Sequence, residues 1–214
     1  RCLLRGKQWL YDYGTHVPLL VRWPGVARPG AVRDELCLSL DMTASSLMAG
    51  GIEQPEWFHG RPLFGPKARP RDFIVTARDR CDETIERIRS VRDSRYRYIR
   101  NFMPERPYTQ SNAYIESSYP TQRVIKELHA AGKLNAVQEQ WMAPHKPPVE
   151  FYDTQADPFL VRNLAASPEH KTRVAGMSKR LDDWIAETGD KGGIPEPAEE
   201  LNQWINRPGR KKKR

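Results

Sequence analysis

Cysteine and histidine side chains are the first candidates for chemistry in this sequence, because they bind metals, act as nucleophiles and carry protons. The three cysteines lie 35 and 44 residues apart, which matches neither a zinc-binding pair nor a C-x-x-C redox pair. The five histidines show no mutual spacing for a metal either. We therefore predict no metal site in this sequence, and structural or incidental roles for Cys2, Cys37, Cys81, His16, His59, His129, His145 and His170.

Arginines form a second group of candidates, since they recur with a period of two along residues 86–101. Tyr96 and Tyr98 in this segment are rings on which nucleic-acid bases could stack. Glu86 and Asp93 dilute the positive charge, however, and the same alternation is typical of an antiparallel sheet with a polar, solvated face. We predict an exposed sheet face here and no nucleic-acid partner.

The net charge supports that interpretation. The 214 residues carry 35 Lys and Arg against 27 Asp and Glu, a formal charge of +8. Six of the basic residues lie within the last eight positions, which leaves 29 against 27 in the rest of the chain. The excess therefore belongs to a terminal tail, 207–214, which we expect to be disordered and solvated. No run approaches the roughly 18 apolar residues of a membrane span, so we predict no membrane partner.

The N-terminal third of the sequence predicts one strand and one helix. A short apolar run at 17–23, bounded by a Pro-Gly pair, indicates a buried strand. A helix is expected from about 41 to 50, with Asp41 as its N-cap and a Gly-Gly stop. Residues 53–71 are rich in Pro and Gly and predict an irregular connection.

The remainder predicts a small antiparallel sheet with packed helices. A strand is expected at 73–77, and a hairpin over 86–101. Helices are expected at 121–142 and 167–188, and Gly189 ends the second. Together these elements predict an α/β fold with an antiparallel appendage.

Five segments, in the same order, resemble motifs of the formylglycine-dependent sulfatases of the alkaline-phosphatase superfamily. The first, G-K-x-x-x-Y-D-x-G-x-x-V-P-L-L-V-R-W-P-G, begins at Gly6. In the second segment Ala44 replaces the family's usual proline. The five segments span 5–25, 38–52, 60–63, 89–101 and 150–165, and cover nearly the whole chain.

The resemblance implies a fold and a domain order. Residues 1–71 would be the C-terminal portion of an alkaline-phosphatase-like α/β core, and 72–206 a C-terminal antiparallel-sheet subdomain, followed by the tail 207–214. Intact sulfatases of this kind use a formylglycine made from a C/S-x-P-x-R motif and bind a divalent cation, usually calcium. The sequence has neither that motif nor the metal-binding S-D-[NH]-G motif, which in the family's order would precede Arg1. We therefore expect the residues for calcium and formylglycine to lie outside this chain.

The resemblance also implies roles for individual residues. Lys7, in the G-K pair, would be the catalytic lysine that binds a sulfate oxygen and stabilises developing negative charge. Arg78 and Arg80 precede the hairpin and are candidates for binding an anionic sugar, because guanidinium groups match carboxylate and sulfate geometry; a self-paired, solvated loop is the alternative. Tyr11 and Asp12 are expected to be structural.

The function implied is that of the C-terminal half of a sulfatase acting on sulfated carbohydrate or another sulfate ester. We expect the chain to be inactive alone. A phosphodiesterase or phosphonate hydrolase of the same superfamily is the alternative, as is a non-catalytic polyanion-binding remnant that uses the tail. By family, a periplasmic or secreted location is expected, with a signal peptide in the missing N-terminal half. The glycan and the oligomeric state are not specified by the sequence.

Overall fold

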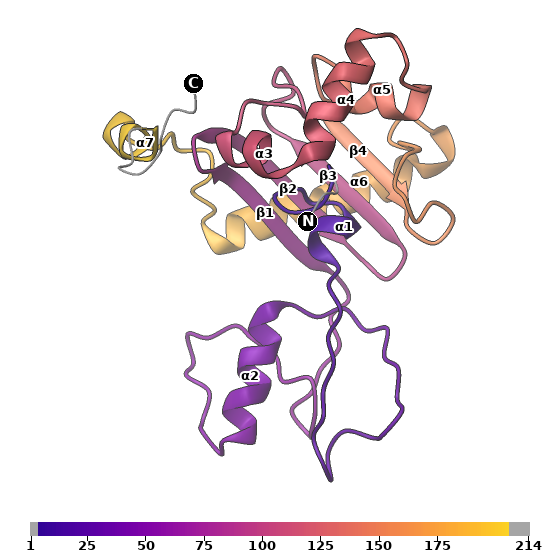
Figure 1. Cartoon of the computed structure of the whole chain (residues 1–214). Coiled ribbons are helices and arrows are strands. Elements are labelled where there is room, and N and C mark those ends of the chain that lie inside the picture. Colours follow the sequence, from indigo (N-terminus) through magenta and orange to yellow (C-terminus); the bar gives the residue numbers. More distant parts are fainter. Residues whose placement is uncertain (1–3, 206–214) are drawn as a thin grey trace.

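The centre of the computed structural model, which describes residues 4–205, is a four-stranded antiparallel sheet in the order β1-β2-β3-β4 (Figure 1). The strands are β1 (Ile74–Cys81), β2 (Thr84–Arg92), β3 (Tyr96–Asn101) and β4 (Val149–Asp153). The helices are α1 (Asp12–Thr15), α2 (Ser39–Ala49), α3 (Ala113–Ser118), α4 (Pro120–Ala130), α5 (Ala136–Met142), α6 (Lys171–Thr188) and α7 (Ala198–Ile205), with a 3-10 turn (Pro168–His170) before α6. None of the helices in this range is long and apolar enough to cross a membrane.

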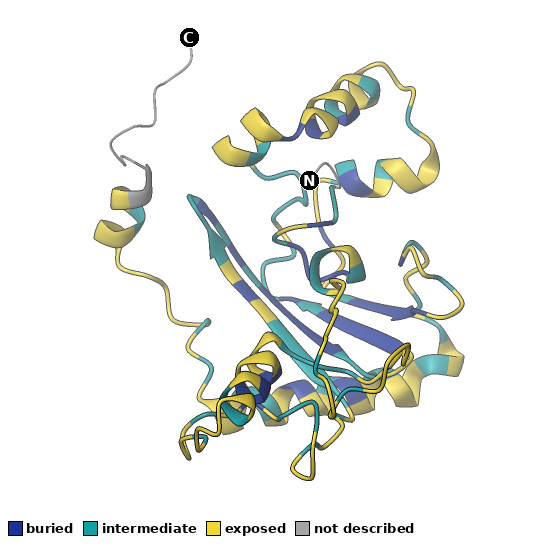
Figure 2. Ribbon diagram, turned by 60° about the horizontal axis from the view of Figure 1, so that its bottom comes forward, coloured by how far each residue is buried: buried dark blue, intermediate teal, exposed yellow. Residues whose placement is uncertain are grey.

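One face of the sheet packs against α6. Val91, Tyr98 and Phe151 from the strands are buried against Met177 and Leu181 of this helix. The helix presents these side chains because its apolar residues recur every three or four positions. Figure 2 shows the buried residues concentrated along the strands and the facing side of the helix.

The other face is covered by the N-terminal segment together with α4 and α5. Ile88 and Ile99 of the sheet contribute to a core with Trp9, Ile125 and Trp141. The chain therefore buries both faces of one small sheet, and its N-terminal residues are part of the second layer.

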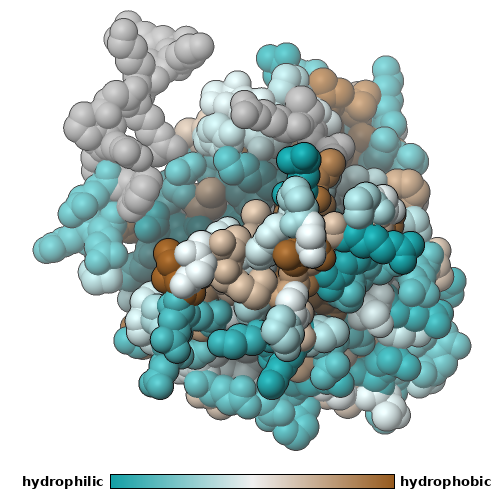
Figure 3. Space-filling view, turned by 90° about the horizontal axis from the view of Figure 1, so that it is seen from below, coloured by the Kyte–Doolittle hydropathy of each residue, from teal (hydrophilic) through white to brown (hydrophobic). Residues whose placement is uncertain are grey.

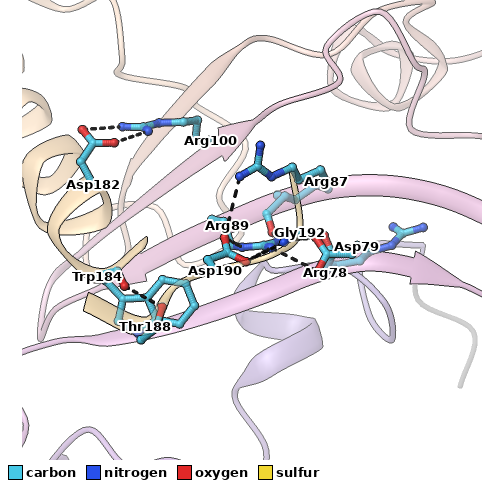
Figure 4. A network of polar contacts seen from close by, with 11 residues as sticks. Arg78, Asp79, Arg87, Arg89, Arg100, Asp182, Trp184, Thr188, Asp190 and Gly192 are labelled. Carbon is cyan, nitrogen blue, oxygen red and sulfur yellow. Dashed lines mark hydrogen bonds and ion pairs between the residues drawn. The ribbon is translucent and has the colours of Figure 1, made fainter. Parts of the chain in front are cut away.

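The arginine-rich face predicted to be exposed is buried, so that prediction is wrong. Arg89 is 1% exposed and donates to Asp79 at 2.6 Å and Asp190 at 2.7 Å (Figure 4). Arg97, on the other face, is 2% exposed and lies 2.7 Å from Asp12. Alternation shows only that the two faces of a strand differ, and it does not show how many layers cover them.

Tyr96 and Tyr98 are also buried, which removes them as platforms for nucleic-acid bases. Tyr96 stacks on Phe151, with ring centroids 5.3 Å apart, inside the core beneath α6. Neither of these two rings is therefore free to stack on a base.

Several predicted elements are confirmed. The hairpin of β2 and β3 turns after Arg92, and β1 extends the strand predicted at 73–77. Helix α6 ends at Gly189, whose φ of 59° is the left-handed conformation expected of a helix-terminating glycine. The helix predicted at 121–142 is instead two helices, because Gly132 (φ 64°) reverses the chain between them.

The strand predicted at 17–23 is absent, and this segment has no regular secondary structure and no neighbouring strand among the described residues. It belongs to a lobe of residues 16–71 that lies apart from the sheet and contains α2 (Figure 1). Leu20, Val32 and Trp57 of the lobe are 90%, 89% and 75% exposed, and Figure 3 shows apolar side chains among polar ones when the molecule is seen from below. An apolar run forms a strand only when another strand satisfies its backbone groups.

Helix α2 confirms the predicted helix, although its cap differs. Asp41 is the third helical residue instead of the N-cap, and its carboxylate accepts from the backbone N–H of Leu38 at 2.8 Å. It also binds Arg71, which ties the end of the lobe back to its helix. The predicted tail at 207–214 lies outside the described residues.

Candidate functional site

Lys7 lies exposed at the tip of a tight turn formed by residues 6–9. The backbone N–H of Trp9 donates to the carbonyl of Gly6 at 3.0 Å, which closes the turn. Gln8 has a φ of 80°, the value that type II turns require at their third position and that glycine usually supplies. A glutamine in this conformation stores strain, so the surrounding contacts must hold the turn in place.

Trp9 is the anchor of that turn. Its ring is 4% exposed and lies edge-on to Trp141, with centroids 5.1 Å apart, and to Tyr108 at 5.5 Å. These contacts fix the residue two positions after Lys7 in the core beneath α4 and α5. The exposed ammonium group therefore projects from a rigid support.

Gly14 holds the turn from the other side. A Cβ atom at this position would lie 2.0 Å from the carbonyl oxygen of Trp9 and 2.5 Å from that of Gly6. Helix α1 can pack against the turn only because residue 14 has no side chain. The G-K-x-x-x-Y-D-x-G pattern is thus a packing requirement that positions Lys7.

Tyr11 and Asp12 join this segment to the sheet, which confirms their predicted structural role. The hydroxyl of Tyr11 donates to Glu150 at 2.7 Å. Arg97 of β3 donates to the carbonyl oxygen of Leu10 at 2.6 Å and to the Asp12 carboxylate. The N-terminal segment is therefore bonded to two neighbouring strands of the sheet.

Among the described residues, no neighbouring side chain neutralises the charge of Lys7. No carboxylate within residues 4–205 lies at ion-pair distance from its ammonium group. The Nζ atom lies 5.1 Å from the centroid of the Tyr114 ring. Burial and Asp82 raise the pKa of the Cys81 thiol, whereas Arg78 and Lys7 lower it. Both cations therefore act on the same end of β1.

The structure brings Arg78 close to this turn and directs Arg80 elsewhere. The Arg78 guanidinium lies over the Trp9 ring, 4.7 Å from its centroid. Arg80 donates to the Glu196 carboxylate at 2.5 Å and to the carbonyl oxygen of Asp82 at 2.7 Å. Of the two candidate arginines, Arg78 is thus the one beside the support of Lys7.

The described residues do not fit a metal. In the range 4–205, no three His, Cys, Asp or Glu side chains are grouped so that they could hold one. Cys37 and Cys81 are free thiols, and Cys2 lies outside the described residues. We therefore derive no catalytic step through calcium from these residues.

Sequence reasoning missed Trp9 and Gly14 as the residues that position Lys7. Gly14 was detectable as a fixed member of the G-K pattern, although its contact with the turn was not. No sequence pattern indicated the buried pair of Lys146 and Glu86, whose charged atoms lie 2.6 Å apart. These two residues are 60 positions apart, and only the path of the chain brings them together.

Comparison with known proteins assigns the family. Residues 4–140 match the family model described as "N-sulphoglucosamine sulphohydrolase, C-terminal". The chain belongs to the sulfatase family. It corresponds to a C-terminal portion of these hydrolases of sulfuric esters, as the motifs predicted.

Similar proteins support the assignment. The chain is 35% identical over 205 residues to an ulvan-active sulfatase of Formosa agariphila, covering 95% of this chain and 34% of the relative. A second ulvan-active sulfatase of that organism is 30% identical over 197 residues, covering 86% and 36% of the two proteins. The chain thus spans about a third of the length of these curated relatives.

A solved structure supports the fold. The chain resembles a 2-O GAG sulfatase with a TM-score of 0.54 and 19% identity, covering 81% of this chain and 30% of the other. The predicted α/β class, with an antiparallel sheet and packed helices, is confirmed. Sulfatases in general use a formylglycine and a metal, and the residues described here supply neither.

Proposed function

We propose that this chain is the C-terminal portion of an enzyme that removes sulfate from sulfated carbohydrate, with Lys7 binding a sulfate oxygen. The observation that carries the proposal is the exposed ammonium group of Lys7, held on a rigid turn without an acidic partner within residues 4–205. A fixed cation of this kind stabilises the negative charge that develops as a sulfate ester breaks.

The proposed substrate class comes from the relatives. Two of them are ulvan-active sulfatases, and the similar solved structure is a GAG sulfatase. We carry sulfated carbohydrate over to this chain and leave the glycan and the position of its sulfate open. The same proposal includes a periplasmic or secreted location, which cell fractionation would check.

Hydrolysis also needs a nucleophile and compensation for the remaining charge. We propose that the intact enzyme uses a formylglycine residue and calcium. Both the formylglycine and the calcium ligands would be residues other than those of this chain. Lys7 would orient the sulfate and stabilise its charge, and it would not itself attack sulfur. The isolated chain should therefore bind a sulfated sugar without hydrolysing it.

A binding measurement on the purified 214-residue chain tests the role of Lys7. Isothermal titration with a sulfated disaccharide should show tighter binding than with the unsulfated sugar, and Lys7→Met should weaken it by about tenfold or more, since hydrogen bonds to charged groups contribute about 1.5–3 kcal/mol. Lys67→Met, an exposed lysine of the lobe, is the matched control and should change nothing. Equal affinity for both sugars, or an unaffected Lys7→Met variant, would contradict the proposal.

A turnover measurement tests whether the chain supplies its own nucleophile. The purified chain should release no sulfate from an aryl sulfate, because it has no C/S-x-P-x-R motif. Robust hydrolysis by this chain would show that its own residues supply the nucleophile. Competition by phosphate diesters equal to that by sulfated sugars would favour the phosphodiesterase alternative.

A further inference from the structure

A cavity of about 360 Å³ lies between the N-terminal segment, helices α4 and α5, and the loop that follows β4. Half of its lining residues are aromatic: Tyr11, Tyr13, Tyr108, Trp141, Tyr152 and Phe159. It shares Leu4, Tyr108 and Trp141 with a smaller cavity that Lys7 lines, so the two cavities lie side by side. A concave site of this size, mainly aromatic and with a few polar groups, is typical of a binding site for a small ligand.

One buried carboxylate fixes the tyrosines of the cavity wall. Glu150 is 1% exposed. It accepts from the hydroxyls of Tyr11 and Tyr152, each at 2.7 Å, and from that of Tyr108 at 3.0 Å. The side-chain amide of Asn101 donates to it at 2.7 Å. Because the three hydroxyls are bound to this carboxylate, the wall offers a ligand aromatic rings in fixed positions.

Arg5 also lines the cavity and supplies it with N–H donors. Its guanidinium carbon lies 3.5 Å from the centroid of the Tyr11 ring, and its Nη1 atom donates to the carbonyl oxygens of Phe159 and Leu160. No carboxylate within residues 4–205 forms an ion pair with it. Burial lowers the pKa of Arg5, but nearby groups that include Tyr11 and Glu150 raise it overall. Since the charge of Glu150 partly compensates that of Arg5, the guanidinium can serve neutral oxygen acceptors and needs no second anion.

Two exposed rings form the rim of the cavity. Phe159 is 61% exposed and Tyr13 is 49% exposed, and the two rings stack with centroids 6.5 Å apart. Leu160, which follows Phe159, is 1% exposed and has a φ of 53°, a conformation that is costly for a residue with a side chain. The hydrogen bond from Arg5 to its carbonyl oxygen, 2.7 Å long, holds it there. The loop thus buries Leu160 and leaves the Phe159 ring at the mouth of the cavity.

We propose that this cavity is a subsite that binds a sugar ring of the glycan, on a residue other than the one whose sulfate Lys7 binds. The inference rests on the proposed function, which supplies carbohydrate as the ligand class. A sugar ring has apolar C–H faces that pack on aromatic rings, and hydroxyl groups at its edge that accept from guanidinium and amide N–H groups. Arg5 and Gln140 provide such donors in the cavity. A purely apolar occupant would leave them without acceptors.

NMR locates the binding without any substitution. The purified 214-residue chain is titrated with two desulfated tetrasaccharides, one from ulvan and one from a GAG, and the valine methyl signals are followed. Val137 and Val161 line the cavity, whereas Val32 lies in the lobe and is 89% exposed. At least one tetrasaccharide should shift the signals of Val137 and Val161 and leave that of Val32 unchanged. No shift of the cavity valines with either sugar, the result expected if another part of the intact enzyme fills the cavity, would overturn the inference.

Phe159→Ala tests the rim of the cavity. Because the ring is 61% exposed, the variant should keep the urea midpoint of the unchanged chain. The Kd for the tetrasaccharide should rise by about threefold to tenfold, the usual effect of losing one aromatic contact. Tyr13→Ala should act in the same way, whereas Trp57→Ala, which removes a ring of the lobe that is 75% exposed, is the matched control and should change nothing. Unchanged affinity in either folded rim variant would overturn the inference.

Lys7→Met separates this inference from the proposed function. The desulfated tetrasaccharides lack the group that Lys7 binds, so this variant should change their affinity by less than about twofold, whereas it should weaken a sulfated disaccharide. If the sulfated ligand is weakened but the cavity valines never shift, the subsite is wrong and the role of Lys7 stands. If the valines shift but Lys7→Met binds the sulfated ligand as the unchanged chain does, the proposed role of Lys7 fails and the subsite stands.

Discussion

Gly14→Ala distinguishes the packing of the Lys7 turn from ordinary helix propensity, because the two predict opposite effects on stability. Alanine in place of glycine within a helix normally stabilises a protein by about 0.5–1 kcal/mol. Here the added Cβ would lie 2.0 Å from the Trp9 carbonyl oxygen and 2.5 Å from that of Gly6. Both are backbone atoms, so neither can turn away as a flexible side chain would.

The size of the effect follows from this overlap. Helix α1 and the turn would have to separate by roughly 1 Å or more to restore van der Waals distances. Since Trp9 is wedged between Trp141 and Tyr108, the turn has little freedom to move. We expect a loss of about 1–3 kcal/mol in the free energy of unfolding, the usual cost of overpacking a core.

Urea denaturation of the purified chain measures the loss, with Gly176→Ala as the matched control. Gly176 lies within α6, and a Cβ atom there would meet nothing within 4 Å. That control should gain about 0.5–1 kcal/mol. The amide NMR signals of Gly6 and Trp9 should shift only in Gly14→Ala. A Gly14→Ala variant that gains stability as the control does would refute the packing argument for Lys7.

Two further predictions concern buried charges. Lys146→Met should lower the free energy of unfolding, measured by urea denaturation, by about 3–5 kcal/mol, because Glu86 then stays in the core without its ion-pair partner. Lys179→Met on the surface should change it by less than about 0.5 kcal/mol. Equal effects of the two variants would contradict the burial of the pair. Hydrogen bonds from Arg89 lower the pKa of Asp190, so their stabilisation is complete above the unfolded pKa of about 4 and is lost as the pH falls to the lower folded value. Asp190→Asn should flatten this acid limb of stability in pH titrations followed by circular dichroism, and an unchanged limb would show that other carboxylates dominate it.

The sequence by itself was sufficient for the family, the hairpin and the long C-terminal helix. Periodicity and turn residues are local properties, so β2, β3 and α6 could be predicted from neighbouring positions. The motif around Lys7 could likewise be read directly, because residues within one turn constrain one another.

Whether a polar strand face meets water was decided only by the tertiary structure. Arg89 and Arg97 looked like an exposed face, yet the segment that follows α6 covers Arg89 and the N-terminal segment covers Arg97. Alternation along a strand cannot reveal which distant elements pack on it. The strand predicted at 17–23 was wrong for the same reason, since a strand depends on a partner that local sequence does not name.

For the candidate site, too, the sequence and the tertiary structure decided different things. The sequence identified Lys7 and could not choose between Arg78 and Arg80, which are equally charged and two residues apart on one strand. The fold distinguished them, because a carboxylate more than 100 positions away binds Arg80, whereas Arg78 is buried over Trp9 without a bound carboxylate among residues 4–205. The sequence shows which side chains are charged. Whether a charged side chain has an ion-pair partner depends on which groups the fold brings close to it.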